Sequence, residues 1–356
     1  MRAVLLLAVL ATCGEPAADP APSRDGSASR APTRAHRLIE DARWHVLAAP
    51  IAFAPGGKHW VGAVDYDLVT FNGGLEVSRL PGVAVFGEPL QALAGGAWFT
   101  ASSIVAADGT VRFSGHAFGQ RYGRFGSAKA MAVDAEGRVA IVAGADSPSA
   151  CLCDRERGSS GSSAGELVRV TFSSEGEPRE RVLIVHGGRE EFSVAASRDS
   201  IAAVTSNQLK VWSTIGDAPP IVVPIEPGSR LEHLTWAGDR YLIGARYVDV
   251  EHHEIVVFDR DAGYRRTTSF VVEGTIGALA VRPGGAELAI ATNRYRARTV
   301  VEVDVKAISI VDLTGKVHAR VALDAVAIAL AWRPDGKALL ATLSSPVEAV
   351  VRYTVR

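Results

Sequence analysis

The sequence predicts an all-β protein, a seven-bladed β-propeller of four-stranded antiparallel blades. The first observation is a repeat: Ala278–Leu288 and Ala329–Leu339 both show an apolar strand, a Pro/Gly turn and a second apolar strand. Weaker copies begin at Ile51, Leu90, Met131, Val194 and Leu234. Their spacing, roughly 40 to 60 residues, is typical of propeller blades. The second observation is that short runs of Val, Ile and Thr recur, whereas helical periodicity is sparse.

Length and composition favour one large domain. The 356 residues are 47% hydrophobic and 22% charged, which is ordinary for a globular protein with a substantial core. A repeat array of this kind forms one domain despite its length. The formal net charge of −1 gives no indication of a nucleic acid or an anionic surface as partner.

The N-terminus has the parts of a secretory signal. One basic residue, Arg2, precedes an apolar run that is too short to span a bilayer, which takes about 20 residues. Leu10-Ala-Thr-Cys13 resembles the lipobox of bacterial lipoproteins, which implies a signal peptide over residues 1–12 and a lipid on Cys13. Gly14 resembles an outer-membrane address, so the resemblance implies an outer-membrane or periplasmic lipoprotein. The alternative is an ordinary signal cleaved nearby, with Cys13 incidental.

A flexible tether is expected after the signal. Residues 13–36 are rich in Ala, Pro, Ser, Gly and Arg, and cannot bury enough apolar surface to fold. Residues 37–356 then form the propeller domain. Its last repeat has room for three strands, Ala327–Trp332, Ala338–Leu343 and Ala349–Val355. We expect residues 38–47 to supply the fourth strand and close the ring, which removes two sheet edges. The alternative is a helical turn lying across the ring.

Three strands extend the comparison to a family. Gln208–Ser213 resembles the strand ending in Trp-Asp that names the WD-repeat family, with Ser213 in place of the aspartate. Ile255–Asp259 and Ile308–Asp312 are related strand ends. The Gly-His dipeptide of that family does not recur at regular positions, so residues 37–356 resemble a divergent WD-repeat-like propeller. The resemblance implies that loops between second and third strands share one face with the connections between blades.

Three repeats have insertions at this loop position, Cys151–Ala164, Tyr247–Glu254 and Asn293–Asp304. Enlarged loops on one face nominate it as a binding face, although surface loops also tolerate insertion at little cost. The candidate binding residues are Asp154, Arg155, Arg157, Glu251, His252, Arg294, Tyr295, Arg296 and Arg298.

Metal binding has weak candidates in Cys151, Cys153, His252 and His253. Their spacing matches no paired-ligand motif, and a local disulfide or free thiols explain the cysteines better. Adjacent histidines in a strand point to opposite faces, so both cannot easily face one ligand. Arg294, Arg296 and Arg298 alternate and either grip an anion or pair with Glu302 and Asp304, of which pairing is favoured.

Catalytic signatures are absent from the sequence: there is no nucleophile elbow, phosphate loop, dinucleotide fingerprint or His-Glu-x-x-His. No catalytic residue and no cofactor are therefore expected. We expect an exported, non-enzymatic scaffold that binds a protein or envelope component and meets the membrane through a lipid anchor. The alternative is a propeller hydrolase or lactonase with a metal in its central channel.

Overall fold

The chain divides into two units, Met1–Arg34 and Ala35–Arg356, and the second unit contains every strand. A computed structural model describes residues 36–83, 90–93, 97–100, 103–106, 109–114, 127–133, 139–145, 164–172, 178–187, 193–205, 208–214, 216, 218–226, 231–249, 251–296, 302–344 and 346–356.

Six blades each consist of four successive antiparallel strands. Blade one contains β2 (Ile51–Phe53), β3 (Trp60–Val64), β4 (Asp67–Asn72) and β5 (Leu75–Leu80). Blade two contains β6 (Leu90–Ala92), β7 (Trp98–Thr100), β8 (Ser103–Val105) and β9 (Val111–Ser114). Blade three contains β10 (Ser127–Val133), β11 (Val139–Ala145), β12 (Ala164–Phe172) and β13 (Pro178–Gly187). Blade four contains β14 (Ser193–Ala196), β15 (Ser200–Thr205), β16 (Gln208–Ser213) and β17 (Ile221–Pro224). Blade five contains β18 (Leu231–Ala237), β19 (Tyr241–Asp249), β20 (His252–Asp259) and β21 (Arg265–Glu273). Blade six contains β22 (Thr275–Val281), β23 (Glu287–Arg296), β24 (Glu302–Asp312) and β25 (Val317–Ala322).

The seventh four-stranded sheet is composite, so the repeats yield six self-contained blades and not seven. Its strands β26 (Ala327–Trp332), β27 (Ala338–Leu343) and β28 (Ala349–Val355) come from the last repeat, and β1 (Leu38–Trp44) comes from the other end of the domain. β1 pairs antiparallel with β28, and Arg37 and Arg356 exchange backbone hydrogen bonds of 2.8 and 3.1 Å. The expected closing strand is confirmed, and the alternative of a helical turn is wrong.

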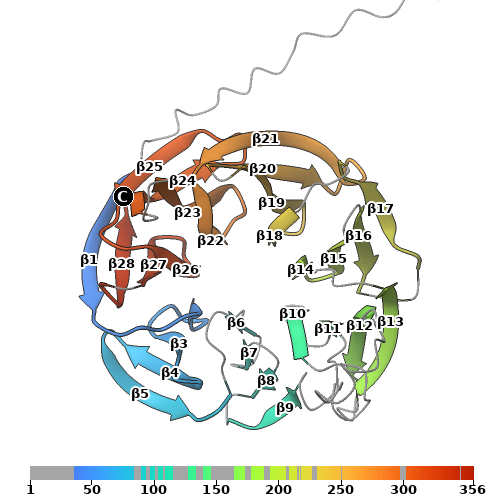
Figure 1. Ribbon diagram of the computed structural model, residues 1–356. Helices are drawn as coiled ribbons and strands as arrows, with labels where there is room; N and C mark the ends of the chain where they lie inside the picture. Colours follow the sequence, from blue (N-terminus) through green and yellow to red (C-terminus); the bar gives the residue numbers. More distant parts are fainter. Residues whose placement is uncertain are drawn as a thin grey trace, which may run out of the picture. The chain divides into compact units, whose positions relative to one another are not determined.

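The first strand of each blade lies nearest the centre and the fourth strand lies at the rim (Figure 1). Contacts join β26 to β2, β2 to β6, β10 to β14, β14 to β18, β18 to β22 and β22 to β26. The hydrophobic core fills the spaces between facing blades. Trp332, Ile308 and Leu339, for example, belong to one buried cluster between blade six and the composite sheet. Trp332 therefore packs between blade six and the composite sheet.

The second-to-third connections lie on one face of the domain, the hairpin face. Two of the expected loops there are instead strands. β19 continues to Asp249 and β20 begins at His252, so that strands cover most of the Tyr247–Glu254 insertion. β23 and β24 contain 10 and 11 residues, against 5 and 6 in β3 and β4 of blade one. The interpretation of these insertions as long loops is therefore wrong: they lengthen a two-stranded hairpin.

Candidate functional site

The tip of the β19–β20 hairpin is held by polar contacts within its turn. The Glu251 N–H donates to Asp249 Oδ1 at 2.8 Å, and His252 Nδ1 lies 2.9 Å from the same oxygen. The backbone donor, followed by His252, lowers the pKa of the Asp249 carboxyl. The Gly274 N–H closes the connection to blade six by donating to the Glu251 carbonyl at 2.6 Å. The turn is therefore an ordered element, although its side chains are solvent-exposed.

His253 lies under this tip. It is 2% exposed, and its Nδ1 is 3.2 Å from the Gly274 carbonyl oxygen, so that this nitrogen carries the proton. Its ring meets Tyr247 edge to face, with centroids 5.5 Å apart. His252 points the other way, toward Asp249. The two rings lie on opposite sides of β20, as strand alternation requires.

The tip combines apolar and charged surface. Tyr247 and Val248 are 46% and 48% exposed. They lie beside Asp249 and Glu251, which are also exposed. Large apolar side chains bordered by charges are typical of a protein contact surface.

The second hairpin of this face is β23–β24. Its Arg294 is exposed, and the strand register places Arg296 directly opposite Glu302. A register shift between Arg294 and Tyr295 leaves Asp304 without a partner in the ladder. This register fits the predicted pairing of Arg296 with Glu302, whose side chains the structure does not describe. Arg298 lies outside the described residues.

The remaining predicted residues lie in parts that the structure does not describe. They are Cys13, Cys151, Cys153, Asp154, Arg155 and Arg157. Within the described ranges, no group of three His, Cys, Asp or Glu side chains could hold a metal ion. Within the same ranges, no helix has the length and apolarity to cross a membrane.

His233 lies on β18, the innermost strand of blade five, at a break in the register with β19. It has the left-handed backbone angle φ of 49°, which is uncommon for a residue other than glycine. Part of the residue is open to solvent, but surrounding protein atoms, and then the nearby His253, lower the pKa of its imidazole. The neutral form of the His233 imidazole is therefore favoured.

A charged cluster that sequence reasoning missed lies between β19, β20 and β21. Glu254 is buried, and its carboxylate forms ion pairs with Arg246, at 2.5 Å, and with Arg266. Glu226, on the connection after β17, also contacts both arginines. The available signal was Glu254 itself, because it begins the apolar run Ile255–Phe258 and needs partners when that strand is buried.

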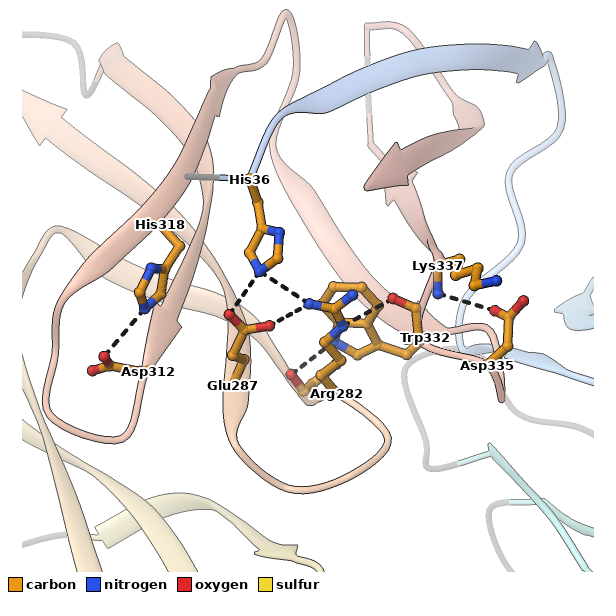
Figure 2. A network of polar contacts seen from close by, with 10 residues as sticks. His36, Arg282, Glu287, Asp312, His318, Trp332, Asp335 and Lys337 are labelled. Carbon is orange, nitrogen blue, oxygen red and sulfur yellow. Dashed lines mark hydrogen bonds and ion pairs between the residues drawn. The ribbon is translucent and has the colours of Figure 1, made fainter. Parts of the chain in front are cut away.

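The repeated arginine has a structural role on the face opposite the hairpin face (Figure 2). Arg282, in the first turn of blade six, donates from Nε to the Gly336 carbonyl of the composite sheet at 2.9 Å. Its guanidinium lies over the Trp332 ring, 5.2 Å from the centroid, and pairs with Glu287. Glu287 also contacts His36 Nε2 at 3.0 Å, which fixes the chain just before β1. This network therefore connects blade six to the composite sheet and to the residue that precedes β1, the strand that closes the ring.

We expect Arg282→Gln to lower the free energy of unfolding by about 1–3 kcal/mol, since it removes a partly buried hydrogen bond, a cation–π contact and an ion pair together. Arg333→Gln is the matched control from the other copy of the repeat. Its side chain pairs with its neighbour Asp335 at 2.8 Å, and we expect a loss of about 0–1 kcal/mol. Denaturant unfolding of both variants measures the difference. Equal losses would contradict the assigned role.

Comparison with known proteins finds similarity among solved structures only. No family model matches the sequence, and no curated protein matches it. Among solved structures, Raptor from Chaetomium thermophilum is 11% identical with a TM-score of 0.62, and the match covers 90% of this chain. The match covers 29% of the Raptor chain, so this chain spans less than a third of that protein.

Two other solved structures match along most of their own length. The β-propeller domain of Cps50 (Swd1) from Myceliophteria thermophila is 12% identical, with a TM-score of 0.59 and coverage of 90% of this chain and 98% of that one. The C-terminal WD40 domain of Sif2 is 12% identical, with a TM-score of 0.50 and coverage of 86% and 81%. At these identities the likeness concerns the fold alone: this chain is an all-β propeller, similar in fold to a WD40 domain.

Proposed function

We propose that this protein is a non-enzymatic scaffold that binds a protein partner through its hairpin face. The observation that carries the proposal is the lengthened β19–β20 hairpin, which exposes Tyr247 and Val248 beside charged residues. Aromatic side chains bordered by charge supply contact area together with orientation, as protein interfaces require. The β23–β24 hairpin, with the exposed Arg294, extends the same face.

Preorganisation supports this assignment. Binding is weakened when a loop has to be ordered by its partner, and a tip already held by hydrogen bonds avoids part of that cost. The contacts of Asp249 with Glu251 and His252 hold the turn, and buried His253 supports the Tyr247 ring from below. The tip therefore presents Tyr247 and Val248 in a defined geometry.

We further propose that the protein is exported and lipid-anchored at Cys13 in a bacterial envelope, with residues 13–36 as the tether. The sequence supports this through its lipobox-like Leu10–Cys13 segment. β1 starts at the face opposite the hairpin face: Leu38 is opposite Val355 there, whereas Trp44 is opposite Val350 at the other end.

The test is site-specific photo-crosslinking in cells, with a photoreactive amino acid at position 248. We expect a discrete crosslinked partner that mass spectrometry identifies, and at least roughly fivefold less of it when Tyr247→Ser is also present. Position 317 is the matched control, since Val317 is an exposed valine at the start of β25, at the end of blade six that lies away from the hairpin face. Equal crosslinking from both positions would overturn the assignment to the hairpin face.

A further inference from the structure

A half-open groove lies on the rim between blade four and blade five. It has a volume of 380 Å³ and runs between β17 on one side and β19, β20 and the start of β21 on the other. Its apolar lining comes from Val222, Ile225, Leu231, Val256, Phe258 and Tyr264. This size is sufficient for a few side chains of a bound segment. The groove is separate from the tip that carries Tyr247 and Val248.

Two arginines are fixed side by side at the edge of this groove. Arg246 and Arg266 both line it, and both pair with Glu254, which is 7% exposed. Like charges repel, so one buried carboxylate between them is what keeps the two guanidinium groups together. Arg266 also donates to the Ser269 hydroxyl, which restricts it further.

Glu226 approaches the same two arginines from the solvent side. Its side chain is 62% exposed, and it pairs with Arg246 and lies 3.8 Å from Arg266. Because it stands on the connection after β17, it can leave without disturbing a strand. Glu226 therefore occupies the position that the carboxylate of a bound ligand would take, and an exposed ion pair of this kind is weak enough to exchange.

We propose that this groove binds an extended segment of another protein in which an acidic residue adjoins bulky apolar residues. The acidic side chain displaces Glu226 from Arg246 and Arg266, and the apolar side chains fill the groove. Charge complementarity supports this occupant: three arginines line the groove, Arg265 being the third, whereas Glu226 is the one acidic residue among the described residues of its lining.

Recognition occurs through side chains and not through strand addition. β17 is preceded by Pro219 and Pro220 and ends at Pro224, and prolines at a sheet edge obstruct pairing with a further strand. The protein's own residues 14–35 do not fit the groove, since they contain no Val, Leu, Ile, Met or aromatic residue. The occupant therefore comes from a different chain.

The test starts from a phage-displayed library of random decapeptides selected on the purified full chain. We expect a consensus of Asp or Glu beside Leu, Ile or Phe. A fluorescein-labelled peptide of that consensus is then titrated by fluorescence anisotropy. Replacing its acidic residue by the amide should weaken binding roughly tenfold, and Arg266→Gln should have the same effect. Glu226→Gln should instead tighten binding, by roughly threefold, because it removes the competing carboxylate.

Arg240→Gln is the control, because Arg240 is an exposed arginine of the same blade that pairs with Asp259 outside the groove. Thermal unfolding of each variant checks that the fold is kept. The proposal is overturned when no acidic and apolar consensus emerges, or when the peptide binds the Arg266→Gln variant and the parent equally. It is also overturned when dodecanoate binds with this arginine dependence and peptides do not. Tyr247→Ser should leave peptide binding unchanged, which separates this site from the hairpin face.

Discussion

Deleting residues 36–44 is expected to lower the midpoint of thermal unfolding by roughly 10 °C. The deletion removes β1 and with it the ladder from Leu38↔Val355 to Trp44↔Val350, so that β28 becomes an open edge. The deletion also removes the contact between His36 and Glu287. It further removes Asp41, which accepts a hydrogen bond from Arg352 Nε at 2.8 Å. Together the lost backbone hydrogen bonds and half-buried side chains amount to about 5 kcal/mol.

Deleting residues 14–34 is the control and should leave the midpoint unchanged, because these residues lie outside the unit Ala35–Arg356. A synthetic peptide of residues 36–46, added in excess, should raise the midpoint of the shortened domain by mass action. Differential scanning calorimetry measures the midpoint for both deletion variants and for the shortened domain with the added peptide. If the shortened domain melts like the parent and ignores the peptide, ring closure by β1 contributes little stability.

The repeat was sufficient to predict four-stranded antiparallel blades, because its signal is local, but the predicted number of seven was wrong. In both copies the glycine of the turn donates to the arginine carbonyl, Gly285 to Arg282 at 2.9 Å and Gly336 to Arg333 at 2.8 Å. Gly285 and Gly336 have positive φ values of 74° and 68°, which glycine adopts without strain. The conformation of such a turn depends on residues that are adjacent in the sequence, so it can be predicted from the sequence alone.

The hairpin extensions were mistaken for loops for a physical reason. Within a blade the middle strands are covered on both sides, and the run Ile255–Phe258 of β20 is accordingly apolar. Toward the tip, Asp249, Glu251 and His252 carry polar side chains, while the ladder still pairs Tyr247 with His253 and Asp249 with His252. Polar composition therefore indicates exposure here and not the absence of a strand.

The charged clusters could not be predicted, because their partners are distant in sequence. Glu254 pairs with Arg246 and Arg266, which come from two different strands. Glu287 contacts His36, which is 251 residues away in the sequence. Such pairs exist after the blades have packed, and no spacing in the sequence encodes them. They are also the places where the binding groove and the ring closure acquire their specificity.

Cys13→Ala is expected to abolish lipid labelling and to release the protein from the membrane fraction. The reason is chemical: the thiol of this cysteine is the atom that a lipobox presents for acylation, and alanine has no nucleophile to replace it. The experiment uses cells of a bacterium that processes lipoproteins, fed an alkyne fatty acid, with click detection and membrane fractionation as readouts. Cys151→Ala is the matched control, a cysteine of the exported chain outside the signal.

The parent and the Cys151→Ala variant should be labelled equally and sediment with the membrane, and Cys13→Ala should do neither. Equal labelling of all three proteins would mean that Cys13 carries no lipid, and that the apolar segment is an ordinary signal preceding a secreted propeller.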